Sequence, residues 1–411
     1  MKKRTLAIIC MSLLSIGLGF LTFIVVSQSL YNPFVSHNDL TDSSQVKPEK
    51  LFLNSWKIIK KRYYDSSLNH QNWEKWKNRY IDNIKTEEDA HLAINTMLAS
   101  LDDPYSRFLN AQEYAEQTTS IDSKIVGIGI NISSVSGKIV IISTVENTPA
   151  QKAGVKAGDI LSKVDDKDVH GKNISEIAQL IRGEEGTIVK IEIIRNGKKI
   201  VKTLTRAQIE IKSVKHKILP ENIGYIQITS FLGTNVAEDF LSSLNSIKDT
   251  KGLILDLRGN TGGLLPNAVF ITDLFLKEGN IVSIVDRNGI KSDINAQDKV
   301  SLTQKPMIIL IDGATASASE IVSGALKDYK MAVLVGEKTY GKGMVQKIYP
   351  MPNKTGMNLT IAKYLTPNGA DINKKGILPD YVVKYTEEDY YAKKDPQLDE
   401  AKKIMRKMCS L

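Results

Sequence analysis

Residues Gly313–Glu320 have the sequence Gly-Ala-Thr-Ala-Ser-Ala-Ser-Glu, and this stretch decides the fold of the second half of the chain. The continuous apolar run before it, residues 305–312, predicts a buried strand. Apolar residues at helical spacing after it predict a helix. Ser317 and Ser319 therefore lie in a tight strand-to-helix connection of very small residues, where a hydroxyl can be exposed and backbone N–H groups are free. Such a connection suits a nucleophile.

A serine hydroxyl needs a base to take its proton. The five histidines all lie upstream and none stands in a motif, which argues against a Ser-His-Asp triad, although folding brings distant residues together. Lys342 is the better candidate because it is flanked by glycines, in Tyr-Gly-Lys-Gly at 340–343, and burial of its ammonium would lower its pKa. From these residues alone, a helix start followed by a surface lysine in a glycine turn remains an alternative.

The composition is that of a globular protein with room for two or three domains. The chain has 411 residues, of which 42% are hydrophobic and 25% are charged, and this excludes wholesale disorder. The net charge of +9 is spread along the chain, and its densest run, Lys57–Arg62, indicates a solvated helix face rather than a nucleic-acid or membrane patch. With only Cys10 and Cys409, a disulfide framework and a cysteine metal site are excluded.

The N-terminal residues have the pattern expected of an export signal. Three basic residues at 2–4 precede an apolar run from Leu6 to Val26 that is long enough to span a bilayer. Residues 1–30 are therefore predicted to be a signal peptide or a signal anchor, and the small residues Ser27 and Ser29 leave cleavage open. The rest of the chain is expected on the far side of the membrane, in the periplasm or at the cell surface.

After the apolar run, the residue pattern is first polar and then has helical spacing. Short strands follow, with a hairpin turn at Asn196-Gly197. The rest of the chain alternates strands with helices and ends in a last helix. One strand is expected at Val126–Ile130. The predicted segments are a linker at 31–48, a helical N-terminal region at 49–120, a small β domain at 121–207, an αβ core at 208–385 and a C-terminal helical segment at 386–411.

A glycine-rich loop, Arg258–Gly263, follows the buried strand predicted at 252–257. It lacks both the lysine-serine ending of a P-loop and a complete G-x-G-x-x-G, so nucleotide binding is disfavoured. We interpret Asp256 and Arg258 as structural.

The segments TASASEIVSGALKDY at 315–329 and VGEKTYGKGMVQ at 335–346 closely resemble the C-terminal processing peptidases, the tail-specific serine proteases of peptidase family S41. The resemblance extends over residues 49–405 and includes Leu101–Leu109, similar to the family's L-D-x-P-Y-S-x-F-L string. It implies that Ser317 is the nucleophile, that Lys342 is the general base and that Gln346 orients the lysine. The glycine loop resembles L-D-L-R-x-N-x-G-G, which implies an oxyanion hole formed by the N–H groups of Gly263 and Ala318.

Residues 121–207 look like a PDZ domain, on the strength of Pro149-Ala150 and of the run Ala153–Leu161. Such domains add an extended chain to a sheet edge and hold its terminal carboxylate with backbone amides. The resemblance places this role on Val126, Gly127, Ile128 and Gly129. The alternative is that the two glycines merely shape a bulge in a small β domain.

The fold class implied is multidomain α+β, with an N-terminal membrane segment, a helical N-terminal region, a PDZ domain and an αβ protease core of the ClpP/crotonase-like type that carries a Ser-Lys dyad. The implied function is that of a serine endopeptidase that cleaves polypeptides at or near their C-terminal tails in the cell envelope. No metal or organic cofactor is required. Partners expected are polypeptide substrates and the membrane, without nucleic acid, and a homo-oligomer is left open.

Three alternatives accompany this reading. Ser319 is the rival nucleophile. A membrane-tethered PDZ adaptor with an inactive protease core is the rival function, and a cytosol-facing scaffold is weakened by the basic residues before the apolar run. The chain also departs from the family at Ala370-Asp371, where an arginine commonly follows the glycine, so packing or gating of that loop is expected to differ.

Overall fold

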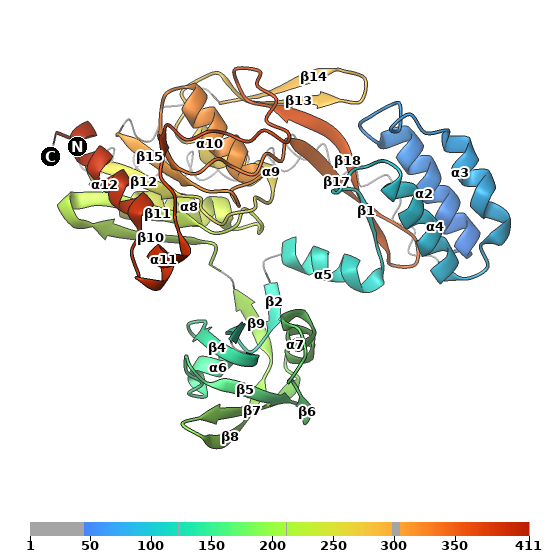
Figure 1. Cartoon of the computed structure of the whole chain (residues 1–411), viewed down its shortest axis with the longest axis horizontal. Helices are drawn as coiled ribbons and strands as arrows, with labels where there is room; N and C mark the ends of the chain where they lie inside the picture. Colours follow the sequence, from blue (N-terminus) through green and yellow to red (C-terminus); the bar gives the residue numbers. More distant parts are fainter. Residues whose placement is uncertain (1–44, 122–123, 136, 211, 298–304, 411) are drawn as a thin grey trace, which may run out of the picture. The chain divides into compact units, whose positions relative to one another are not determined.

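The computed structural model describes residues 45–121, 124–135, 137–210, 212–297 and 305–410, and it divides the chain into two compact units. Of the described residues, those up to 116 and those from 213 onward form one unit, and those between 117 and 212 form the other (Figure 1). The apolar run predicted to cross the membrane lies outside the described residues. Within the described ranges, every helix is too short or too polar to span a bilayer.

The larger unit begins with three helices that pack together beside a sheet (Figure 1). These are α2 (Pro48–Arg62), α3 (Trp73–Tyr80) and α4 (Glu87–Ala99), with the short η1 (Ile81–Asn83) between the last two. The indoles of Trp56 and Trp73 fix α2 against α3, because each donates to the other residue's backbone carbonyl, at 2.9 and 3.1 Å. The basic side chains at the end of α2 are exposed, as the sequence predicts.

The region predicted to be helical at 49–120 also contains a strand, which corrects the prediction. The strand β1 (Arg107–Leu109) pairs antiparallel with β18 (Gly356–Leu365) in a five-stranded sheet. Its three residues are too few to give a periodic signal, so the sequence does not reveal it. The other strands of this sheet are β13 (Asn280–Asp286), β14 (Lys291–Asn295) and β17 (Met344–Pro350).

The centre of the larger unit is a six-stranded sheet in which all neighbours are parallel except the first pair. Its order is β10 (Val214–Leu219), β11 (Ile223–Ile228), β12 (Gly252–Asp256), β15 (Met307–Ile311), β16 (Val333–Gly336) and β19 (Tyr381–Val382). Strands β12 and β15 are buried throughout, which explains their continuous apolar sequences.

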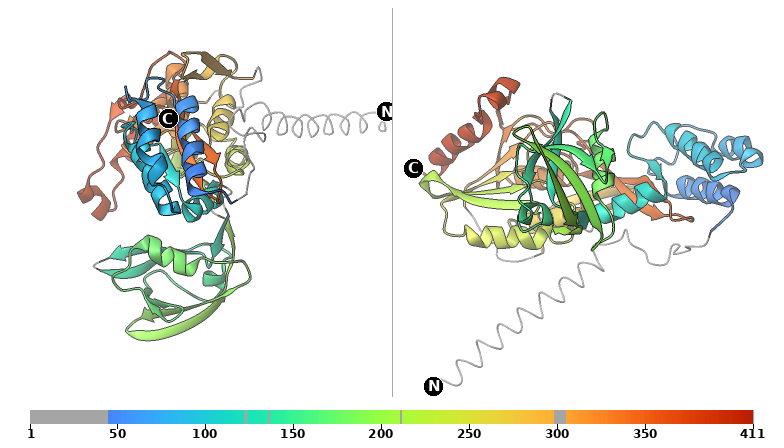
Figure 2. Two further views of the ribbon diagram at one scale, coloured as in Figure 1. Left: turned by 90° about the vertical axis from the view of Figure 1, so that its right-hand side faces the viewer. Right: turned by 90° about the horizontal axis from the view of Figure 1, so that it is seen from below.

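Helices cover both faces of this sheet. Alternate residues of β12 point to opposite sides, so Leu253 and Leu255 join one core while Ile254 joins the other. The first core is closed by α8 (Val236–Ser246), α9 (Leu265–Asp273) and α10 (Ala318–Asp328). The second is closed by α12 (Pro396–Met408), which lies across the sheet from α8 (Figure 2). The short helices η2 (Pro220–Asn222) and α11 (Glu387–Tyr391) lie in the connections.

The smaller unit is a β domain with two short helices. Its main sheet has the order β3 (Ile130–Val135), β4 (Lys138–Thr144), β5 (Ile160–Val164), β7 (Ile188–Arg195) and β8 (Lys198–Thr205), with β6 (Lys167–Asp168) beside β5. The helices are α6 (Pro149–Lys152) and α7 (Ile174–Ile181), and α5 (Ala111–Ile121) leads from one unit to the other. The Asn196-Gly197 turn joins β7 to β8, as predicted.

The single strand expected at Val126–Ile130 is wrong. Strand β2 (Lys124–Gly127) ends at Gly127 and pairs with β9 (Ala207–Glu210), and a new strand begins at Ile130. The break falls at Gly129, whose φ of 78° is in the left-handed region. A side chain here would also collide with Thr148, because a Cβ atom would lie 2.4 Å from it.

Candidate active site

Ser317 is the residue before α10, in the turn that follows β15. Its φ of 56° lies in a region that a residue with a side chain rarely adopts. Two hydrogen bonds hold the turn: Ala316 N–H donates to Asn260 O at 3.0 Å, and Tyr364 Oη donates to Ser317 O at 3.1 Å. Ser317 is partly exposed although both of its neighbours are buried. The turn therefore keeps this one serine accessible.

Ser319 is in a different environment. It is fully buried, and its Oγ donates to Asn260 O at 2.9 Å. Its own carbonyl accepts a hydrogen bond from Ser323 Oγ at 2.8 Å. A hydroxyl that is buried and already donating cannot meet a substrate carbonyl without rearrangement of the helix. The geometry therefore favours Ser317 over Ser319.

Glu320 connects the Ser317 turn to the loop that carries Lys342. Its carboxylate is fully buried and accepts four hydrogen bonds, two at each oxygen. Oε2 accepts from the backbone N–H groups of Ser317 and Lys342, both at 2.9 Å. Oε1 accepts from Thr339 Oγ1 at 2.5 Å and from Gly341 N–H at 2.8 Å. A single buried carboxylate thus holds the two backbones side by side.

Lys342 lies in the loop between β16 and β17 and is partly buried. Burial lowers the pKa of its ammonium, and the charges of Asp103 and Glu320 oppose this effect. Its Nζ lies 5.0 Å from the centroid of the Tyr105 ring, within the range of a cation–π contact. Lys342 and Ser317 are linked through Glu320, because the backbone N–H groups of both residues donate to its carboxylate. A direct hydrogen bond between Lys342 Nζ and the Ser317 hydroxyl is not among those of the described residues.

Gln346 lies on β17, at a bulge in its pairing with β18. Its Nε2 donates to Thr360 Oγ1, at a long distance of 3.4 Å. The expected contact between Gln346 and Lys342 is not among the hydrogen bonds of the described residues. The amide therefore lies on the strand that leaves the lysine loop, and Thr360 is its partner.

The glycine loop packs directly against the Ser317 turn. A Cβ atom on Gly262 would lie 2.8 Å from Ser317 Cβ and 2.9 Å from Ala318 N, so only glycine fits. Asn260 shapes the loop from within, since its Oδ1 accepts from Gly262 N–H at 2.9 Å. In the described part of the chain no acceptor is found for the N–H of Gly263 or of Ala318. Two free amides of this kind can stabilise an oxyanion.

In the smaller unit, β3 is an edge strand, and α7 packs beside it. Partly buried apolar residues from both elements line this region: Ile130 and Ile132 on β3, and Leu180 on α7. Of the four residues expected to hold a carboxylate, Val126 and Gly127 belong to β2, whereas Ile128 and Gly129 directly precede the edge strand. An open sheet edge beside a helix can accept an extended peptide.

Comparisons with known proteins agree with this organisation. Residues 222–383 match peptidase family S41, and residues 140–195 match a PDZ domain. The carboxyl-terminal-processing protease of Synechocystis is 36% identical over 346 residues, which cover 82% of this chain and 81% of that protein. The chain belongs to the carboxyl-terminal-processing proteases of family S41. It is therefore a serine peptidase with a PDZ domain.

Further relatives of this protease extend the comparison. The carboxy-terminal processing protease CtpA of Bacillus subtilis is 40% identical over 301 residues, covering 72% of this chain and 64% of that protein. The solved structure of a photosystem II D1 C-terminal processing protease has a TM-score of 0.57 at 30% identity. It covers 82% of this chain and 94% of its own.

Arg258 of the protease is structural, as the sequence indicates. Its guanidinium bonds Asp256 at 2.7 Å and Asp395 at 2.8 Å, and so ties the start of α12 to the end of β12. Burial opposes the charged form, but the hydrogen bonds to these carboxylates raise the pKa of Arg258 above its ordinary value. A further bond to Gln397 at 3.1 Å completes the attachment of the C-terminal helix.

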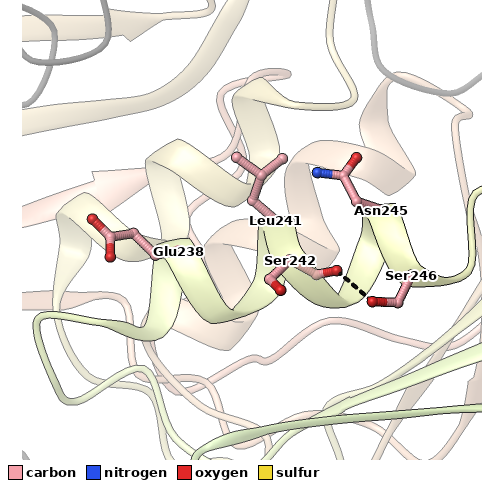
Figure 3. Close-up of a pocket in the computed structure, with 5 residues that line it drawn as sticks. All are labelled: Glu238, Leu241, Ser242, Asn245 and Ser246. Carbon is pink, nitrogen blue, oxygen red and sulfur yellow. Dashed lines mark hydrogen bonds between the residues drawn. The ribbon is translucent and has the colours of Figure 1, made fainter. Parts of the chain in front are cut away.

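A surface depression of about 710 Å³ lies elsewhere on the protease, along one side of α8 (Figure 3). Its lining residues all come from this helix, namely Glu238, Leu241, Ser242, Asn245 and Ser246. None of them belongs to the Ser317 turn, the lysine loop or the glycine loop. The depression is therefore separate from the three segments that carry the candidate residues.

Two parts of the site were not assigned from the sequence. Glu320 is the last residue of a Ser-x-x-Glu string, which is a capping-box signal in the sequence. The sequence does not indicate that its carboxylate also binds the loop that carries Lys342. Asp103 and Tyr105 come from a segment far earlier in the chain, and no local pattern indicates that they face Lys342.

Proposed function

We propose that this protease is an endopeptidase that cleaves polypeptides at or near their C-terminal tails, with Ser317 as nucleophile and Lys342 as general base. The observation that supports this most is the shared carboxylate of Glu320, which draws the backbones of both residues to one oxygen atom. The partial burial of Lys342, which lowers the pKa of its ammonium, supports the same assignment.

In the proposed reaction the neutral Lys342 amine takes the proton of the Ser317 hydroxyl as Oγ attacks the substrate carbonyl. The N–H groups of Gly263 and Ala318 bind the oxyanion of the tetrahedral intermediate. The Lys342 ammonium returns its proton to the leaving amine, and an acyl-enzyme remains. Water then attacks the acyl carbonyl and loses a proton to Lys342. The Lys342 ammonium returns this proton to Ser317 Oγ as the ester bond breaks, which releases the carboxylic acid and regenerates the serine hydroxyl. These steps use no metal or organic cofactor.

Gln346 has a supporting role in this proposal. Its Nε2 is held by Thr360, which leaves the amide oxygen able to accept a hydrogen bond from the Lys342 ammonium. The oxygen would then orient the side chain of the base without taking part in proton transfer. Replacing Gln346 with alanine should therefore cost less activity than replacing Lys342.

For substrate capture, we propose that a C-terminal tail adds to the β3 edge beside α7, with its carboxylate near Ile128 and Gly129. The open edge supplies main-chain hydrogen bonds, and the apolar residues of β3 and α7 contact the tail side chains. The basic residues at 2–4 and the apolar run after them support an extracytoplasmic location, with residues 1–30 as signal peptide or anchor.

The test is cleavage of a tail-bearing protein by the full chain and by matched serine variants. Ser317→Ala and Lys342→Ala should each abolish turnover while the melting curve stays close to the wild type. Ser319→Ala is the control, because it removes a buried hydroxyl outside the proposed chemistry. A fluorophosphonate label should map to Ser317. Turnover by either of the first two variants, or label on Ser319, would contradict the assignment.

A further inference from the structure

The segment Leu101–Leu109 follows α4 and includes β1. It lies against the loop that carries Lys342, because the Tyr105 ring faces Lys342 Nζ. Hydrogen bonds fix its conformation. Asp103 Oδ1 accepts from Tyr105 N–H at 3.0 Å, and Asp103 Oδ2 accepts from Ser106 Oγ at 2.5 Å. Ser106 Oγ in turn accepts from Thr360 N–H on β18 at 3.0 Å. These hydrogen bonds attach the backbone around Tyr105 to β18, so the sheet helps to set the position of the Tyr105 ring.

The ring lies where it can act on the lysine charge. Nζ is 5.0 Å from the ring centroid, and an aromatic face attracts an ammonium but not a neutral amine. The Tyr105 hydroxyl does not add a negative charge beside the lysine. Burial, together with a hydrogen bond involving Tyr340, raises the pKa of Tyr105 to about 12, so the hydroxyl stays protonated near neutral pH.

Within the part of the chain that the structure describes, the charges that act on Lys342 come from two segments. Asp103 lies in the same segment as Tyr105, and Glu320 lies at the start of α10. Both carboxylates favour the ammonium, whereas burial favours the neutral amine. A general base has to be neutral when it accepts a proton and charged afterwards. These opposing contributions therefore set the pH at which the lysine can work.

We propose that Tyr105 is a positioning residue for the active-site lysine: its ring holds Lys342 Nζ at the site and, together with Asp103, favours the protonated state formed during each turnover. This inference rests on the proposed role of Lys342 as the base. It assigns a function to the segment that joins the helical N-terminal region to the protease core. Tyr105 is not a catalytic residue in this scheme, since it acts only through Lys342.

The test is the pH dependence of kcat/KM for the full chain on a tail-bearing protein. Tyr105→Leu keeps an apolar group but removes the aromatic face, so the lysine loses a stabilising partner of its charge. The acidic limb of the pH profile, where kcat/KM rises as Lys342 loses its proton, should move to lower pH by about 0.5 to 1 unit. The value of kcat should fall because Nζ is less well held. Tyr105→Phe keeps the aromatic ring, so its acidic limb should coincide with that of the wild type.

Asp103→Asn provides a second variant that does not depend on the ring. The amide retains an oxygen for Tyr105 N–H and can donate to Ser106 Oγ, so the turn should persist while one negative charge is removed. Its acidic limb should also move to lower pH. Lys347→Met is the matched control. It removes a lysine that lies 5.2 Å from the Tyr349 ring on β17 and should leave the limb unchanged.

The outcomes separate the two proposals. If Lys342→Ala still cleaves, the base assignment fails whatever the Tyr105 variants do. If Lys342→Ala is inactive but the limbs of Tyr105→Leu and Asp103→Asn coincide with the wild type, only the role of Tyr105 and Asp103 is refuted. A limb that moves to higher pH, or an effect in Tyr105→Phe equal to that in Tyr105→Leu, also overturns it.

Discussion

Replacing Glu320 with glutamine is the sharpest test of how the site is assembled. Glutamine has the same shape as glutamate, but one of its two terminal atoms donates hydrogen bonds instead of accepting them. On the Oε2 side the new amide would face two backbone N–H groups, from Ser317 and Lys342. On the Oε1 side it would face Gly341 N–H and the hydroxyl of Thr339.

Neither orientation is tolerated without loss. The Thr339 hydroxyl cannot easily reverse its role, because its oxygen already accepts from Ile377 N–H at 2.7 Å. Two donors in a fully buried site are therefore left without an acceptor in either case. At about 1 to 3 kcal/mol for each buried unsatisfied group, Glu320→Gln should lower the free energy of unfolding by about 2 to 6 kcal/mol. Activity should fall by about a hundredfold or more, since the backbones of the proposed nucleophile and the proposed base are no longer held together.

The assay combines urea unfolding with kcat on a tail-bearing substrate. Glu176→Gln is the matched control, since Glu176 occupies the same capping position at the start of α7 but is exposed. It should cost only tenths of a kcal/mol, as an exposed cap does at the low end of the measured range. If Glu320→Gln were as stable and as active as this control, the view that Glu320 joins the two loops would be refuted.

Three further predictions concern charge. Arg258→Ala should lower the free energy of unfolding by about 3 kcal/mol, measured by urea denaturation, because Asp256 is left buried without its partner. Burial opposes ionisation of Asp395, but the hydrogen bond from Arg258 lowers its pKa, so its contribution to stability is present above its unfolded pKa. That contribution should be lost as the pH falls through the lower folded value, and Asp395→Asn should flatten this part of the stability curve. Ser106→Ala leaves Asp103 Oδ2 without its donor and should move the acidic limb of kcat/KM to higher pH.

The sequence predicted those strands, helices and turns that have a local signal, such as an apolar run, a helical spacing of apolar residues or a turn dipeptide. The apolar run at 305–312 became β15, buried on both sides, and the helix after it became α10. The Asn196-Gly197 signal predicted a hairpin turn, and this turn joins β7 to β8. These predictions are confirmed because periodicity and turn chemistry are local properties of the sequence.

The failures have a common physical cause. The strand expected at Val126–Ile130 is broken at Gly129, where a left-handed φ and the proximity of Thr148 depend on tertiary packing. The strand β1 exists only because β18 lies beside it. In the same way, the aromatic face near Lys342 comes from Tyr105, and nothing in the local sequence indicates which surface that ring meets. Contacts between distant segments leave no periodic signal.

The surroundings of Lys342 explain how two acidic residues can lie near a lysine that is proposed to act as a base. A carboxylate in direct contact with the ammonium would raise its pKa and keep it charged. Here both carboxylates are occupied by other donors: Glu320 by three backbone N–H groups and a threonine hydroxyl, and Asp103 by Tyr105 N–H and Ser106 Oγ. The ion pairs of the described residues accordingly leave Lys342 out. The two acids organise the backbone around the amine, and burial is left as the dominant influence on its charge.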